Sequence, residues 1–127
     1  MSVAPPSSMS DAYSETTRGI TVSVQPVYLE HQSEPDEGRY LWAYHVRIEN
    51  HSDAVAQLLT RHWRIVDARG QAHDVIGDGV VGEQPVLEPG EAFEYTSGTP
   101  LTTSSGFMSG SFRMISEAGE MFDVSVP

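Results

Sequence analysis

The sequence predicts an all-β fold, an antiparallel β-sandwich of two sheets with about seven or eight strands, of the immunoglobulin or fibronectin type III kind. Two observations carry this prediction. From residue 18 onward, apolar residues alternate with polar ones instead of recurring at helical spacing. Clusters of Gly, Pro, Asn and Asp interrupt the alternation after roughly every 8 to 15 residues, which is typical of short strands joined by turns. A closed barrel is the alternative arrangement.

The first two expected strands show the alternation most clearly. Residues 19–29 place three aliphatic side chains on one face, namely Ile20, Val22 and Val24. Pro26 has no backbone N–H, so we expect this strand to lie at a sheet edge or to bend there. Residues 39–50 place five apolar side chains on one face, namely Tyr40, Trp42, Tyr44, Val46 and Ile48. The Asn-His-Ser-Asp sequence at 50–53 supplies the turn that follows.

The third expected strand, within residues 54–70, has an inconsistent pattern. Leu59, Trp63 and Ile65 share one face, and Arg61 has the same parity. Either a β-bulge shifts the register between Leu59 and Trp63, or Arg61 lies along the sheet with its charged head paired.

The remaining strands follow at short intervals. Residues 71–76 form a short strand that leads into a glycine-rich segment, and residues 91–98 place Phe93 and Tyr95 on one face before an expected loop at 98–106. The last two strands, 106–116 and 120–127, form a hairpin. Its inward residues are Met108, Phe112, Met114, Phe122, Val124 and Val126.

The chain is expected to hold one domain, at residues 18–127, after an N-terminal arm. Residues 1–17 are rich in Ser, Pro, Ala and Met and show no apolar period. Such a segment buries too little apolar surface to offset its conformational entropy, so the arm is expected to be disordered.

Composition excludes several classes of chemistry. The 127 residues include no cysteine and no lysine, and the net charge is −11. Thiol chemistry, thiolate zinc sites and Schiff-base catalysis are therefore excluded. The acidic balance argues against nucleic acid; it either serves only to keep the protein soluble or favours a cation or a basic protein surface as partner. With no long apolar run and no secretory signal pattern, we expect no membrane insertion, a cytoplasmic location, and a monomer or weak homodimer.

A glycine motif raises the question of a nucleotide site. Gly77, Gly79 and Gly82 have the G-x-G-x-x-G spacing of dinucleotide-binding loops. That motif requires a helix directly after it, which Pro85 and Pro89 forbid here. We interpret the segment as a tight turn; binding of phosphate or pyrophosphate by its backbone amides is the alternative, although four acidic residues lie within 78–91.

Metal and catalytic motifs are weak. No pair of the five histidines has zinc-signature spacing, and the acidic segment 30–37 lacks the ligand intervals of a calcium loop. No metal ligand is therefore assigned and no cofactor is expected. No serine lies in a nucleophile motif, so the protein is not expected to be an enzyme.

A cationic cluster surrounds one tryptophan. Its residues are Arg61, His62, Trp63 and Arg64. They either pair with Asp67 or Glu94 across strands or form a local recognition patch.

Three segments together resemble the ApaG family. They are LLTRHWRIVDARG (58–70), VIGDGVVGEQPVLEPGEAFEYTSGTPL (75–101) and GFMSGSFRMISEAGEMFDVSVP (106–127). The resemblance implies a fibronectin type III-like sandwich and a bacterial protein, also called CorD, linked to cobalt tolerance and magnesium efflux without an established activity. Related domains are fused to F-box and polymerase-interacting proteins, which implies a protein-binding module. A pyrophosphate-binding role carries over only to Gly77, Gly79 and Gly82.

Together these inferences favour a non-enzymatic module that binds an unidentified protein, with strand addition at a free edge as the physical route. A phosphate-containing ligand at the glycine segment is the alternative function. Direct divalent metal binding is a weaker one.

Overall fold

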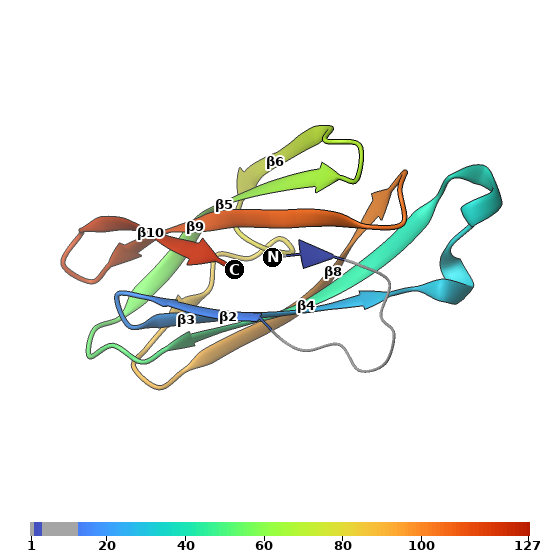
Figure 1. Ribbon diagram of the computed structural model, residues 1–127. Helices are drawn as coiled ribbons and strands as arrows, with labels where there is room; N and C mark the ends of the chain where they lie inside the picture. Colours follow the sequence, from blue (N-terminus) through green and yellow to red (C-terminus); the bar gives the residue numbers. More distant parts are fainter. Residues whose placement is uncertain (1, 4–12) are drawn as a thin grey trace.

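Two antiparallel sheets form a β-sandwich in the computed structural model, which describes residues 2–3 and 13–127 (Figure 1). One sheet has the order β2 (Tyr13–Thr17), β3 (Ile20–Tyr28), β4 (Tyr40–Asn50) and β8 (Ala92–Leu101). The other has the order β1 (Ser2–Val3), β9 (Gly106–Ser116), β5 (Ala56–Asp67) and β6 (Ala72–Asp78). In addition, β10 (Met121–Val126) pairs with β9, and β7 (Val86–Leu87) pairs with β5. The predicted fold class is confirmed.

Local structure differs from the expectations at three places. Residues 13–17, expected to belong to a disordered arm, form β2 and pair with β3 from Tyr13–Val24 to Thr17–Ile20, while residues 1 and 4–12 lie outside the described residues. The expected loop at 98–106 begins later, because β8 continues to Leu101. The acidic segment at 30–37 forms two single 3₁₀ turns, η1 (Glu30–Gln32) and η2 (Pro35–Glu37).

Pro26 lies within β3 at a place where, among the described residues, the strand pairs with β4 alone. β4 pairs along the whole of β3, but β2 ends opposite Val24. The missing N–H of Pro26 therefore removes no hydrogen bond to β2. Up to Val24 the strand lies between β2 and β4, and at Pro26 it pairs with β4 alone among the described residues.

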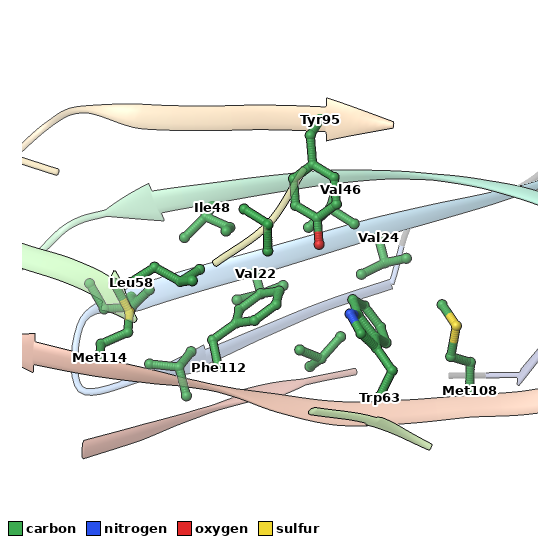
Figure 2. Packing of buried hydrophobic residues seen from close by; sticks show 14 of the residues in the cluster. Val22, Val24, Val46, Ile48, Leu58, Trp63, Tyr95, Met108, Phe112 and Met114 are labelled. Carbon is green, nitrogen blue, oxygen red and sulfur yellow. The ribbon is translucent and has the colours of Figure 1, made fainter. Parts of the chain in front are cut away.

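The core fills the space between the two sheets (Figure 2). Side chains of β3 and β4 such as Val22, Val46 and Ile48 face Leu58, Phe112 and Met114 of the opposite sheet (Figure 2). Trp63 packs edge-on against Phe112, with ring centroids 5.8 Å apart, and against Tyr44 at 5.3 Å. The inward faces predicted for β3, β4 and the hairpin of β9 and β10 are confirmed.

A β-bulge in β5 resolves the conflict between Leu59 and Arg61. The register against β9 shifts between Leu58 and Thr60. Leu58 is fully buried instead of Leu59, and Trp63 and Ile65 are buried beyond the bulge. Because the bulge adds one residue at Leu59, the even-numbered residues of β5 face inward before the bulge and the odd-numbered residues face inward after it.

The two lateral sides of the sandwich differ. On one side β10 packs against β2, and the Ser125 amide donates to Thr17 Oγ1 at 3.3 Å. Arg18 strengthens this closed side through an ion pair with Glu120 at 2.8 Å and by lying over the Phe122 ring. On the other side, pockets separate β8 from β5 and β6. We call this second side the open side.

Asn50 joins the turn after β4 to β7. Its side chain is fully buried, and Nδ2 donates to the carbonyl oxygens of Ala54 at 2.8 Å and Leu87 at 2.9 Å. Oδ1 accepts from the amide and the hydroxyl of Ser52. The side-chain amide of Asn50 thus uses all its hydrogen-bonding capacity to join the end of β4, the turn at 52–54 and β7.

Replacement of Asn50 should therefore destabilise the fold strongly. Asn50→Ala removes the donor to the buried carbonyl of Leu87 and the acceptor of the Ser52 amide, while the carbonyl of Ala54 keeps the Ser52 hydroxyl as a donor. The free energy of unfolding should therefore fall by about 2 to 4 kcal/mol. Urea denaturation followed by tryptophan fluorescence measures the change. Ser14→Ala, which removes an exposed hydroxyl pair with Ser23, serves as the control and should change stability by less than about 0.5 kcal/mol. Equal effects of the two substitutions would contradict the role of Asn50.

Candidate functional site

The bulge in β5 anchors the glycine segment. The carbonyl oxygen of Leu59 accepts from the amide of Gly79 at 2.8 Å and from Nε2 of Gln84 at 2.9 Å. The amide of Leu58 donates to the carbonyl of Pro85 at 3.0 Å. Both ends of the glycine segment are therefore fixed at the place where β5 changes register.

Between these anchors the chain makes a two-residue turn. Val80 and Glu83 exchange backbone hydrogen bonds of 2.8 and 2.9 Å, and the residues between them have left-handed backbones, with φ of 45° at Val81 and 80° at Gly82. Two successive left-handed residues define a type I′ turn. A β-branched residue rarely adopts this conformation, so Val81 is strained. The side chain of Val80 is fully buried and holds the turn against the core.

Arg61 supports the same segment from β5. Its Nη1 donates to the carbonyl oxygens of Asp78 at 3.0 Å and Gly79 at 2.8 Å. Gly77 lies opposite Arg61 in β6, and a Cβ there would lie 3.0 Å from both terminal guanidinium nitrogens. Glycine at 77 therefore makes room for the arginine head.

The glycine motif thus has a structural explanation. No helix follows it; a turn and β7 follow, as Pro85 and Pro89 predict. A Cβ on Gly79 would lie 2.1 Å from the carbonyl oxygen of Glu83, so a side chain at 79 is excluded by backbone. The amide of Gly79 already binds Leu59, whereas the amides of Val81 and Gly82 donate no hydrogen bond within the described chain.

The cationic cluster around Trp63 is divided between two faces. Arg61 and Trp63 point inward, while His62 and Arg64 are exposed on the outer face of the sheet. A single patch of four residues, one of the two readings of the sequence, is therefore wrong. The other reading named the wrong acid, because Asp74 of β6 is the partner: His62 Nε2 lies 3.1 Å from Oδ1 and Arg64 Nη1 lies 3.6 Å from Oδ2.

Arg61 differs from most arginines of this chain. Arg18, Arg39, Arg64 and Arg113 each lie within ion-pair distance of a carboxylate. Arg47 contacts Glu49 and Glu94, and these contacts lower the pKa of both carboxyl groups. Among the described residues, no carboxylate lies within 4.0 Å of the guanidinium nitrogens of Arg61, although the side chain is partly buried. The charge of Arg61 is held by carbonyl dipoles alone.

A pocket of about 170 Å³ lies beside Arg61 on the open side of the sandwich. Its lining includes Tyr44 and Tyr95 from the facing sheet, Trp63 beneath, and the turn at 81–82 at the rim. The hydroxyl of Tyr95 is buried without a hydrogen-bond partner. Burial raises the pKa of Tyr95, and the positive charge of Arg61 opposes part of this rise. The geometry therefore brings a cation and an unsatisfied phenol to one cavity.

Sequence reasoning identified Arg61, Trp63 and Gly82 here but missed Tyr44 and Tyr95 as polar groups. Both were assigned to inward faces as apolar residues. The available signal was the hydroxyl itself, since a buried tyrosine normally finds a hydrogen-bond partner.

Other sites have less geometric support. Within residues 2–3 and 13–127, no three His, Asp or Glu side chains come together in a way that could hold a metal ion. The same residues contain no helix of sufficient length and hydropathy to span a membrane. A second cavity on the open side, about 270 Å³ and lined by Ile65, Thr99 and Leu101 among others, contains a carboxylate from Asp67. That carboxylate accepts from the amides of Arg69 and Gln71, so it closes a turn.

Comparison with known proteins agrees with this architecture. The ApaG domain family matches residues 30–116. Protein ApaG of Rhodospirillum centenum is 62% identical over 115 residues, covering 91% of this chain and 88% of that protein. Protein ApaG of Brucella canis is 55% identical over the same shares. The crystal structure of the putative ApaA protein from Bordetella pertussis superposes with a TM-score of 0.84 at 47% identity, covering 85% of this chain and 88% of that one.

The fold and the sheet order define a fibronectin type III-like β-sandwich with a pocket on its open side. Within that class, the chain belongs to the ApaG family.

Gly79 is required by close backbone contact and Gly82 only by its left-handed backbone, so alanine should destabilise the protein more at 79 than at 82. Gly79→Ala should lower the free energy of unfolding by about 2 to 4 kcal/mol, because the new Cβ collides with backbone. Gly82→Ala should cost only about 1 to 2 kcal/mol, because its φ is 80° but nothing lies within 4 Å of the added Cβ. Chemical denaturation measures both.

Gly119→Ala is the matched control for backbone strain. Gly119 has a φ of 84° and open space around it in the hairpin of β9 and β10. If Gly79→Ala is no more destabilising than Gly119→Ala, close approach is not the reason for glycine at 79.

Proposed function

We propose that the protein is a non-enzymatic recognition module that binds an extended segment of a partner protein at the edge of β6. The observation that carries this proposal is the unpaired edge itself. In the described chain β6 pairs only with β5, contains no proline, and exposes 72% of Ile76. An edge of this kind offers backbone donors and acceptors for strand addition, and an exposed aliphatic residue gives the added strand an apolar contact.

The outer face beside Ile76 offers further contacts to a partner. A hollow of about 210 Å³ adjoins Ile76 and is lined also by His62, Ser111 and Arg113. This hollow lies over β5, β9 and β10, on the side of Ile76 away from the free edge, so a side chain of the added strand reaches it only by extending across Ile76. Alternate side chains of an added strand are the usual source of specificity in this binding mode.

Charge on β6 limits the kind of segment that fits. Asp74, Ile76 and Asp78 share the outward face of β6, and Asp74 lies within ion-pair distance of His62 and Arg64. Asp78 makes no ion pair within the described chain. We therefore infer a partner strand with an apolar residue opposite Ile76 and a basic residue near Asp78, which agrees with the net charge of −11.

Family resemblance supports the same conclusion, because it implies a protein-binding module. In this proposal the family link to cobalt tolerance and magnesium efflux acts through the bound partner. Phosphate binding by the glycine segment is the weaker candidate function. Within the turn at 79–83, the amides of Val81 and Gly82 make no hydrogen bond to the described chain, while those at 79, 80 and 83 are used within the protein.

The test compares capture of partners by three immobilised proteins from a lysate of the source organism. Ile76→Lys places a charge on the edge and should reduce recovery of the partner at least about tenfold. Met121→Lys is the matched control, because Met121 is 52% exposed on the same sheet but lies in β10, away from β6. It should recover the partner as the unsubstituted protein does.

Hydrogen exchange on the recovered complex then locates the contact. Amides of β6 that do not face β5 should exchange more slowly in the complex, as expected for new backbone hydrogen bonds. A partner that is lost equally in both variants, or that protects a different surface, would refute strand addition at β6.

A further inference from the structure

We propose that the pocket formed by Arg61, Tyr44, Tyr95, Trp63, Ser97 and the turn at 81–82 binds a carboxylate group. This site lies between the two sheets, whereas the proposed protein contact lies along the edge and outer face of β6. The inference therefore does not depend on the proposed function.

Arg61 has hydrogen-bonding capacity that the protein does not use. Its Nη1 donates to two carbonyl oxygens, and no hydrogen bond within the described chain uses Nε or Nη2. An arginine presents its donors in a planar fork that matches the two oxygens of a carboxylate. The other half of that fork is thus available while Nη1 holds the guanidinium in place over Gly77.

The hydroxyl of Tyr95 is a second unsatisfied group at this pocket. Tyr95 is only 8% exposed, and its oxygen has no hydrogen-bond partner. Figure 2 shows this hydroxyl pointing from β8 into the space between the sheets, toward Trp63. A buried polar group without a partner destabilises a fold. The Tyr95 hydroxyl is almost inaccessible within the pocket wall, so binding requires the Tyr95 side chain to shift until a ligand oxygen can accept its hydrogen.

The form of the pocket limits the ligand. A cavity of about 170 Å³ with Tyr44 and Trp63 as walls accommodates one carboxylate with a small apolar substituent. The hydroxyl of Ser97 adds a second neutral group at its lining. The strained Val81, whose side chain is 55% exposed, lies at the rim.

Charge favours a carboxylate over a phosphate. Arg61 is the one cation that lines this pocket, and the acidic residues Asp78 and Glu83 flank the same turn. A doubly charged phosphate would meet more repulsion and less compensation than a singly charged carboxylate. The free amides of Val81 and Gly82 remain available to orient either oxygen of the ligand.

The test uses small carboxylates as probes and NMR as the readout. Acetate, propionate and benzoate are titrated at constant ionic strength with chloride as the reference salt. Specific binding in the millimolar range should shift the Arg61 side-chain Nε–H signal and the amide signals of Val81 and Gly82. The same signals should respond weakly or not at all to inorganic phosphate. A short peptide with a free C-terminus, compared with its C-terminal amide, shows whether the carboxylate of a protein chain also enters the pocket.

Two substitutions separate binding from structure. Tyr95→Phe removes the buried hydroxyl but leaves the bonds of Arg61 to the turn intact, so it should weaken carboxylate binding roughly threefold to tenfold without loss of thermal stability. Arg61→Gln should weaken binding more than about tenfold. Arg39→Gln, which removes an exposed arginine paired with Glu34, is the control and should bind as the unsubstituted protein does.

The outcomes are distinguishable. Carboxylate-dependent shifts at Arg61 that Tyr95→Phe weakens support the site, whether the free acids or the peptide bind better. Shifts that Arg39→Gln reduces equally, or a titration with no response up to tens of millimolar, would overturn it. Unchanged affinity in Tyr95→Phe together with higher stability would show that the hydroxyl does not contact the ligand, and would overturn the site as proposed.

Discussion

The bulge at Leu59 is the constraint on which most of this structure depends. Because β5 gains one residue there, Leu58 and Trp63 both reach the core although they differ in parity. The same shift turns Arg61 inward and leaves the carbonyl of Leu59 free to accept from both ends of the glycine segment. One irregular residue thus connects core packing, the position of a half-buried cation and the shape of a turn.

Sequence patterns predicted most of the fold because each inner face repeats every second residue. That rule identified the inward residues of β3, β4 and the terminal hairpin, and proline positions excluded a helix after Gly82. The alternation rule could not place the bulge, because the positions of Leu59, Arg61 and Trp63 allowed either a register shift or an inward-facing arginine. The structure has both. The rule could not find β2 either, because Tyr13–Thr17 is a polar edge strand held by backbone pairing and not by burial.

The candidate site was predictable only in part for a related reason. Four adjacent residues at 61–64 look like one patch in sequence, but alternate strand positions face opposite ways, so two belong to the pocket and two to the outer surface. Tyr44 and Tyr95 come together only through the stacking of two sheets, which no local pattern records. The contrast between Arg61 and Arg47 likewise depends on neighbours from other strands.

The unequal sides of the sandwich have a mechanical consequence. Two contacts join the sheets along β2 and β10, namely the ion pair between Arg18 and Glu120 and the hydrogen bond from Ser125 to Thr17. Along β6 and β8, cavities separate the sheets. The two sheets are therefore held together more firmly along β2 and β10 than along β6 and β8. Thermal fluctuations that separate the two sheets should therefore widen the open side first. Water should then reach Trp63 and Tyr95 before it reaches the valines near the closed side.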